Sequence, residues 1–156
     1  MTAVWVVLVA AVALVCAWAV LTAQRLDRLH IRLDRSRDAL QAALDRRCAV
    51  IAAHHERLGP AARAVENIPL RPTDLDSRLR ADAELRARVP DDSATESATG
   101  SDGDMREADT RVLLALRFYN EAVGDTRALR LHPLVRALKL GGTAALPEVA
   151  RMPDVP

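Results

Sequence analysis

The sequence predicts an all-α protein in which a single N-terminal transmembrane helix is continuous with the first, long helix of an antiparallel three- to four-helix bundle. Three observations predict this fold class. Residues 3–23 form an apolar run without a charge, no Gly or Pro occurs before Gly59, and two later stretches repeat apolar residues at heptad spacing. Aromatic residues make up only 3% of the chain, so the core must be aliphatic, which suits helices better than sheets.

The first expected element is the apolar run at residues 3–23. As a helix its 21 residues would extend about 31 Å, close to the thickness of a bilayer's hydrocarbon core. Trp5 and Trp18 lie toward its two ends, where indole rings favour the membrane interface. A cleaved signal peptide is the alternative, because residues 17–19 (AWA) have the small-x-small pattern of a cleavage site. The run is longer than a signal peptide's apolar region and no basic residue precedes it, so we expect a retained anchor.

The flanks of the apolar run predict its orientation. No basic residue precedes it, whereas arginines follow it closely, at Arg25, Arg28, Arg32, Arg35 and Arg37. Basic residues stay on the cytoplasmic side of a membrane. We therefore expect a single-pass protein of the cell (inner) membrane, with the N-terminus outside and the C-terminal domain cytoplasmic.

Composition argues against several functions for the remainder of the chain. All charged residues, 22 basic and 21 acidic, follow Gln24, and a formal net charge of +1 argues against a nucleic-acid binder. Cys16 would lie in the membrane and Cys48 in the cytosol, so the two cannot form a disulfide with each other. We expect no cofactor and no nucleic-acid partner.

The first long helix is expected to continue from the anchor to about Leu58, where Gly59-Pro60 ends it. Apolar residues recur along it at heptad spacing with one four-residue shift, as is typical of a coiled-coil seam. The members of this seam are Leu26, Leu29, Leu33, Leu40, Leu44, Ile51 and Leu58.

A short helix to about Asn67 and a longer one to about Arg88 are expected next, separated by two prolines. Thr73 with Asp76 predicts the N-cap of the longer helix, because an acidic residue three positions after a capping Thr supports the first turn. The residues expected to face inward from it are Leu75, Leu79, Ala83 and either Leu85 or Val89.

Residues 90–104 carry five acidic residues and no basic or large apolar residue, which predicts an acidic flexible loop. Asp104 with Glu107 predicts the cap of the next helix, which should reach about Leu131. A second seam follows at Val112, Leu116, Tyr119, Val123 and Thr126.

Beyond that helix, Pro133 should either break the chain or start the next short helix, which is expected over Leu134 to Leu140. Residues 141–156 begin with Gly141-Gly142 and are expected to be a loosely ordered tail. Residues 24–89 and 105–140 would then form the cytosolic bundle, because two apolar seams cannot remain exposed. Whether the seams pack within one chain or between chains stays open.

Two stretches resemble the LemA family. Residues 117–125 (RFYNEAVGD), followed by Pro133, are similar to the family's C-terminal Tyr-Asn-x-x-Val signature, and residues 40–51 (LQAALDRRCAVI) are similar to its Leu-x-x-Arg-x-x-Leu-Ile segment. The family usually repeats the Tyr-Asn pair a turn or two later, where this chain has Thr126-Arg127. An N-terminal membrane helix that continues into a long helix also resembles the family. The resemblance implies a membrane-anchored helical bundle with no settled biochemical activity.

Tyr119, Asn120 and Asp125 form the first candidate site. Tyr119 lies on the second seam, where its ring can be buried while its hydroxyl needs a partner. A buried Asn at position 120 can fix the register of packed helices by hydrogen bonding across them. These residues would therefore either set the register of the bundle or recognise a partner.

Arg127, Arg130, Arg136 and Lys139 form a second candidate set. They alternate with leucines and a valine within residues 127–140, and no acidic residue interrupts them. Such a basic amphipathic segment can contact an anionic membrane surface. The alternative is an ordinary bundle wall with a solvated face.

No residue pattern predicts catalysis or a metal site. Cys48 and His55 are seven residues apart, which is about 10 Å along a helix and too far to share an ion. The sequence also lacks a Gly-rich phosphate loop and a nucleophile elbow. We therefore expect not an enzyme but a membrane-anchored interaction or assembly platform, with a protein partner or self-association. Binding or remodelling of an anionic bilayer through residues 127–140 is the alternative.

Overall fold

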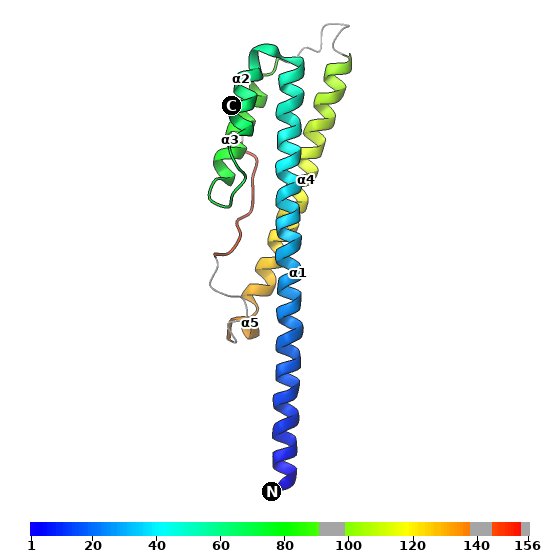
Figure 1. Cartoon of the computed structure of the whole chain (residues 1–156), viewed down its shortest axis with the longest axis vertical. Helices are drawn as coiled ribbons and strands as arrows, with labels where there is room; N and C mark the ends of the chain where they lie inside the picture. The colour runs from blue at the N-terminus through cyan, green and yellow to red at the C-terminus, as the bar shows by residue number, and fades with distance from the viewer. Residues whose placement is uncertain (91–98, 138–144, 154–156) are drawn as a thin grey trace.

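The computed structural model describes residues 1–90, 99–137 and 145–153 (Figure 1). Every regular element within those ranges is a helix, which confirms the all-α class. In chain order the elements are α1 (Thr2–His54), a 3₁₀ turn η1 (Glu56–Leu58), α2 (Gly59–Glu66), α3 (Leu75–Ala87), α4 (Thr99–Leu131) and α5 (Pro133–Ala137).

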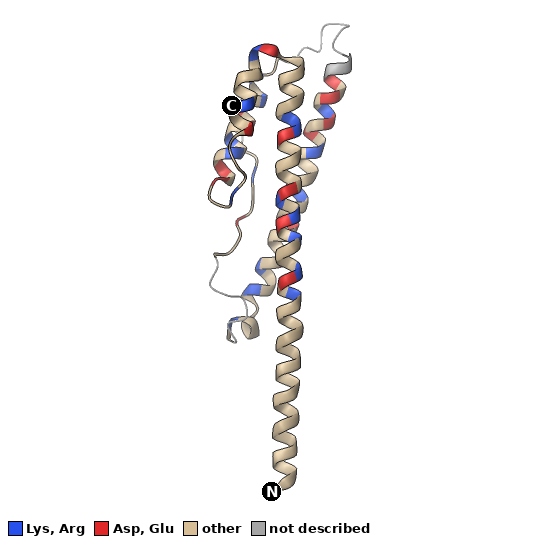
Figure 2. Cartoon of the chain, in the orientation of Figure 1, with Lys and Arg blue, Asp and Glu red and all other residues tan. Residues whose placement is uncertain are grey.

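The two halves of α1 lie in different surroundings. Its N-terminal part, residues 2–24, carries no charge (Figure 2), and most of this part extends away from the other helices (Figure 1). An 18-residue window there has a mean hydropathy of 2.8 and is 0% buried, so this one helix is long and apolar enough to cross a membrane. In the C-terminal half Leu40, Leu44 and Ile51 are completely buried, as expected of the first seam.

The end of α1 differs from the expectation. The helix stops at His54 rather than near Leu58, because His55 adopts φ −128° and ψ 83° and leaves the helical conformation. Gly59 does not act as a left-handed stop. Its φ of −52° and ψ of −46° are helical, and it begins α2, with Pro60 in the first turn where a missing N–H costs nothing.

α4 packs antiparallel along the charged half of α1 (Figure 1). Arg32 pairs with Asp125, and His54 lies beside Asp104. Residues later in α1 therefore contact residues earlier in α4, as in an antiparallel pair. α4 ends at Leu131, as expected. The second seam is buried as the spacing predicts, at Val112, Leu116, Tyr119, Val123 and Thr126.

The apolar core forms two adjoining clusters along this helix pair. The first joins Leu40 and Leu44 of α1 to Leu79 of α3, Val123 of α4 and Ala150 near the C-terminus. The second joins residues of α1 to α2, α3 and the start of α4, at Cys48, Val50, Ile51, Ala62, Val65, Leu85, Met105 and Ala108. α2 and α3 therefore cover the end of α1 that lies farthest from its apolar half.

Both expected helix caps are wrong. α3 begins at Leu75 with Asp74 at the N-cap position and no side-chain cap hydrogen bond, so Thr73 and Asp76 do not form a capping pair. α4 begins at Thr99, so residues 99–104, expected in the acidic loop, are helical and Asp104 lies inside the helix. Residues 91–98, the rest of that expected loop, lie outside the described residues.

The C-terminal region agrees with the expectation in its helix and departs from it in its tail. α5 begins at Pro133, which was one of the two roles expected of this proline, and the remainder of the expected helix, with Lys139, falls in residues 138–144, which lie outside the described residues. Residues 145–153, expected to be loosely ordered, instead pack against the helices, and Ala150 is only 1% exposed within the first core cluster. We call residues 145–153 the C-terminal segment.

Candidate functional site on α4

The C-terminal segment runs between α3 and the α1–α4 pair without regular structure (Figure 1). Side chains of α4 bind its backbone at intervals along its length. Moving from residue 145 to residue 150, the contacts move from Arg130 back to Asn120, so the segment is antiparallel to α4. We call the four residues that make these contacts the α4 binding face: Tyr119, Asn120, Arg127 and Arg130.

Asn120 makes the most specific of these contacts. Its Nδ2 donates to the carbonyl oxygen of Ala150 at 2.8 Å, and the Ala150 amide donates to Asn120 Oδ1 at 2.9 Å. A carboxamide offers one acceptor and two donors in one plane, so it can satisfy both backbone groups of a single extended residue. Asn120 therefore recognises peptide backbone, as a neighbouring β-strand would, and not a particular side chain.

The other members of the α4 binding face bind carbonyl oxygens. Arg127 Nη1 donates to Pro147 at 3.2 Å, Arg130 Nη1 to Ala145 at 2.9 Å, and the Tyr119 hydroxyl to Glu148 at 3.4 Å. Burial raises the pKa of Tyr119, so its hydroxyl stays protonated and able to donate at neutral pH. All three contacts again involve only backbone atoms of the segment.

The segment's own side chains differ in burial. Ala150 is buried and Met152 packs partly against the first core cluster. Val149 is 47% exposed, and Glu148 and Arg151 are exposed. The segment is therefore held by backbone hydrogen bonds together with buried Ala150 and half-buried side chains such as Met152, and other side chains fit at the exposed positions.

The structure brings together residues that the sequence had placed in two separate candidate sets. Tyr119 and Asn120 from the first set, and Arg127 and Arg130 from the second, share the C-terminal segment. Asp125 does not join them: it forms a solvent-exposed ion pair with Arg32 at 2.9 Å. Arg136 is exposed on α5. Lys139 lies outside the described residues.

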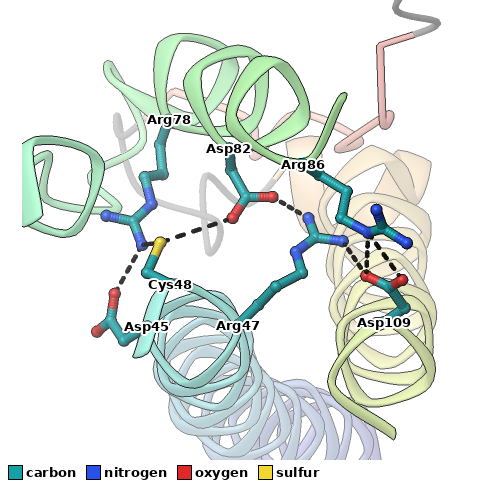
Figure 3. Close-up of polar contacts among 7 residues, drawn as sticks. All are labelled: Asp45, Arg47, Cys48, Arg78, Asp82, Arg86 and Asp109. Atoms are coloured by element: carbon teal, nitrogen blue, oxygen red, sulfur yellow. Dashed lines mark hydrogen bonds and ion pairs between the residues drawn. The ribbon is translucent and has the colours of Figure 1, made fainter. Parts of the chain in front are cut away.

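A second polar cluster, which the sequence analysis missed, is buried where α1, α3 and α4 meet (Figure 3). Arg47 of α1 forms an ion pair with Asp82 of α3 and a 3.1 Å pair with Asp109 of α4. Arg86 Nε donates to the same Asp109 carboxylate at 3.0 Å. We call the full set the Arg–Asp network: Asp45, Arg47, Arg78, Asp82, Arg86 and Asp109.

Arg78 extends the Arg–Asp network to α2. It is almost completely buried, pairs with Asp45 of α1 at 2.7 Å and donates to the carbonyl oxygens of Val65 and Ile68. Those carbonyls lie at and just beyond the end of α2, where backbone acceptors lack helical donors. One arginine of α3 thus contacts α1 and also satisfies the end of α2.

Burial makes this network costly as well as specific. Asp82 is 0% exposed, and desolvation by burial lowers the pKa of Arg47 while the Asp109 carboxylate raises it in partial compensation. The Nε atoms of Arg47 and Arg78 lack a hydrogen-bond partner among the described residues. Ion pairs of this kind fix one arrangement of the helices more than they add net stability.

The thiol of Cys48 lies against the Arg–Asp network. Cys48 contacts Arg78 and Asp82 at 3.9 Å, but burial raises the pKa of its thiol, which disfavours the nucleophilic thiolate. No group of three or more His, Cys, Asp or Glu residues that could hold a metal ion occurs in the part of the chain that the structure describes.

Comparisons with protein-family models, curated proteins and solved structures give no match for this chain. The resemblance to the LemA family therefore stays a prediction from the residues that carry it.

Proposed function

We propose that this protein is a single-pass membrane protein whose packed helices form a cytoplasmic interaction platform without catalytic activity. The observation that carries the proposal is the contrast within α1: its apolar window is 0% buried, although the same helix is packed by α2, α3 and α4 farther along. An uncovered apolar surface of this length is costly in water and favourable in a bilayer. The LemA resemblance, which implies a membrane-anchored helical bundle, agrees with this proposal.

The anchor would set the height of the platform above the membrane. Residues 24–54 of α1 extend about 46 Å at ~1.5 Å per residue. The arginines that follow the apolar run support a cytoplasmic location for this part, because basic residues stay on the cytoplasmic side of a membrane. The Arg–Asp network holds α3 against α1 and α4, so the platform would present a defined surface.

Topology and processing test the anchor. A reporter active only in the cytoplasm, fused after Pro156, should be active, and one active only outside should be silent. The mass of the purified chain should include residues 1–23. An active outer reporter, or a mature chain that starts near Ala19, would show a signal sequence instead and would place the helices outside the cytoplasm.

Crosslinking in cells tests the platform. A photoreactive amino acid at exposed Phe118 on α4 should give a discrete crosslinked product, whereas the same group at exposed Val12 in the apolar run should not give that product. A chain that remains uncrosslinked at Phe118 and monomeric after extraction would count against the platform.

A second candidate function is contact with an anionic membrane surface through the end of α4 and α5. His132, which precedes α5, lines the same surface cavity as Arg25 of α1, so α5 begins near the first charge after the apolar run (Figure 2). Leu131 and Leu134 are exposed there, beside exposed Arg136. Apolar and basic side chains exposed at this level suit the headgroup region of a bilayer.

Liposome flotation tests this second candidate. A chain lacking residues 1–23 should keep its other helices, because the apolar window of the removed stretch is 0% buried and so does not pack against them. Flotation that requires anionic lipid, weakens with salt and is lost in Arg136→Glu would support surface binding. Equal behaviour on neutral and anionic liposomes would exclude it.

A further inference from the structure

We propose that the α4 binding face is a docking site for an extended peptide segment of a partner protein, and that the chain's own C-terminal segment occupies the site when the partner is absent. This inference rests on the proposed function as an interaction platform and names the kind of partner it takes. The partner segment is extended over about six residues and carries a small residue where Ala150 now lies.

The contacts define this chemistry. Asn120 satisfies both backbone groups of one residue, and Arg127 and Arg130 bind carbonyl oxygens at 3.2 Å and 2.9 Å. These four hydrogen bonds all involve backbone atoms of the segment. Another extended chain can therefore form the same hydrogen bonds, provided that a small side chain enters the buried position of Ala150.

The C-terminal segment is suited to being displaced. Its one fully buried side chain is an alanine, which offers little apolar area, and four of the other eight residues are exposed. Asn120 is itself only half-buried, so water can satisfy its amide when the segment leaves. Release of the segment uncovers the part of the first core cluster against which Ala150 and Met152 pack, and a partner segment must cover that part again.

A surface hollow beside Asn120 offers a partner a contact area that the C-terminal segment does not line. It is lined by Leu113, Leu116, Arg117, Asn120 and Glu121, and no residue of the segment lines it. Leu113 is 62% exposed there. A partner segment with an apolar side chain beside its small residue would fill this hollow and so compete with the attached segment.

Covalent attachment makes the occupant a regulator of the site. A tethered segment competes at an effective concentration on the order of millimolar, so it weakens a free peptide without any change in the site itself. Removal of the C-terminal segment should therefore increase the affinity for a free peptide at least about tenfold.

The test measures binding of a fluorescein-labelled synthetic peptide of residues 145–153 to the full chain in detergent micelles, by fluorescence anisotropy. Three chains are compared: wild type, Ala150→Arg, and a chain that ends at residue 144. The shortened chain keeps the test valid if Ala150→Arg fails to fold. Circular dichroism must first show that helical content and thermal unfolding of the shortened chain match those of the wild type.

We expect at least about tenfold tighter binding to the shortened chain than to the wild type. Asn120→Ala in the shortened chain should weaken that binding about tenfold, whereas the exposed neighbour Glu121→Ala should leave it unchanged. A folded shortened chain that does not bind, or that binds equally with Asn120→Ala, would overturn the proposal.

Variant peptides test the chemistry of the partner. Exchanging Glu148 for Gln and Val149 for Thr in the peptide should change affinity less than about threefold, because both side chains are exposed. Exchanging Ala150 for Leu should abolish binding. Equal loss from all three exchanges would overturn the recognition of backbone.

The state of association distinguishes a foreign partner from a second copy. Light scattering should show the same number of chains per particle for the wild type and the shortened chain at every concentration. Dimers of the wild type that disappear in the shortened chain would assign the site to a neighbouring copy and overturn the foreign partner. None of these measurements depends on membrane orientation, so this inference and the proposed function fail separately.

Discussion

The Arg–Asp network and the α4 binding face attach segments of the chain by opposite means. The network has a buried centre, and its ion pairs join charged side chains to one another, such as Arg47 with Asp82. The α4 binding face is half-buried and uses side chains such as Asn120 to contact backbone. Damage to the network leaves a buried charge without its partner, whereas damage to the binding face leaves groups that water can satisfy. The Arg–Asp network should therefore define the fold, and the α4 binding face should allow one bound segment to be replaced by another.

The largest expected effect comes from breaking the network at Asp82. Asp82→Ala removes a partner from buried Arg47 and should lower the free energy of unfolding by about 3–5 kcal/mol, measured by chemical denaturation. Glu84→Ala, on the exposed side of the same helix, should change it by less than about 0.5 kcal/mol. Replacing Arg47 and Asp82 together by Met and Leu should recover most of the loss; an additive loss would contradict this account of the network.

Asn120→Ala should lower the free energy of unfolding less than Asp82→Ala does, but it should strongly increase the mobility of the C-terminal segment. The two hydrogen bonds to Ala150 contribute on the order of 1 kcal/mol each, because their surroundings are only half-buried. Amide exchange at Ala150 should become roughly tenfold faster, while amides of α3 near Asp82 keep their protection. Acceleration in both places would show that the two regions are not independent.

Alkaline pH should weaken both regions in separable steps. Burial raises the pKa of Cys48 above its ordinary value of 9.0 and that of Tyr119 above 10.0. The unfolded chain therefore loses these protons first, so the free energy of unfolding falls as the pH rises above each ordinary value. Denaturation curves should show that Cys48→Ala removes the fall that begins near pH 9.0 and Tyr119→Phe the fall near pH 10.0. A stability that is constant from pH 8 to pH 11 would contradict both shifts.

The smallest effect is expected for the exposed pair of Arg32 and Asp125, whose side chains are 56% and 51% exposed. Arg32→Ala should lower the free energy of unfolding by no more than about 0.5 kcal/mol, and less in high salt, because solvent and ions screen such pairs. A loss comparable to that of Asp82→Ala would mean that burial does not separate the two kinds of contact.

The sequence predicted the apolar faces well and the polar core poorly. On α3, Ala83 was expected inward, but it is half-buried and the completely buried neighbour is Asp82. Leu75, Arg78, Leu79, Asp82 and Leu85 recur at spacings of three and four, so charged residues occupy the seam itself. A charge at a seam position was the available signal, but hydrophobicity alone directs attention to the nearest alanine.

The packing of the C-terminal segment was likewise not predicted from the sequence. Tyr119 and Asn120 were recognisable as unusual polar residues on or beside a seam, but residues 145–153 contain no periodic pattern that predicts packing. Their attachment depends on backbone groups, which every residue carries and which leave no trace in composition. The segment's order could therefore not be predicted from its own residues.

The sequence by itself determined the helical class, the uncharged half of α1 and the two buried seams, because each depends on the spacing of residues within one helix. Only the tertiary structure decided which charges are buried and where the C-terminal segment lies. Arg47 and Asp82 are 35 residues apart, and Asn120 and Ala150 are 30 apart. Contacts over such distances depend on how the helices pack, which no local pattern records.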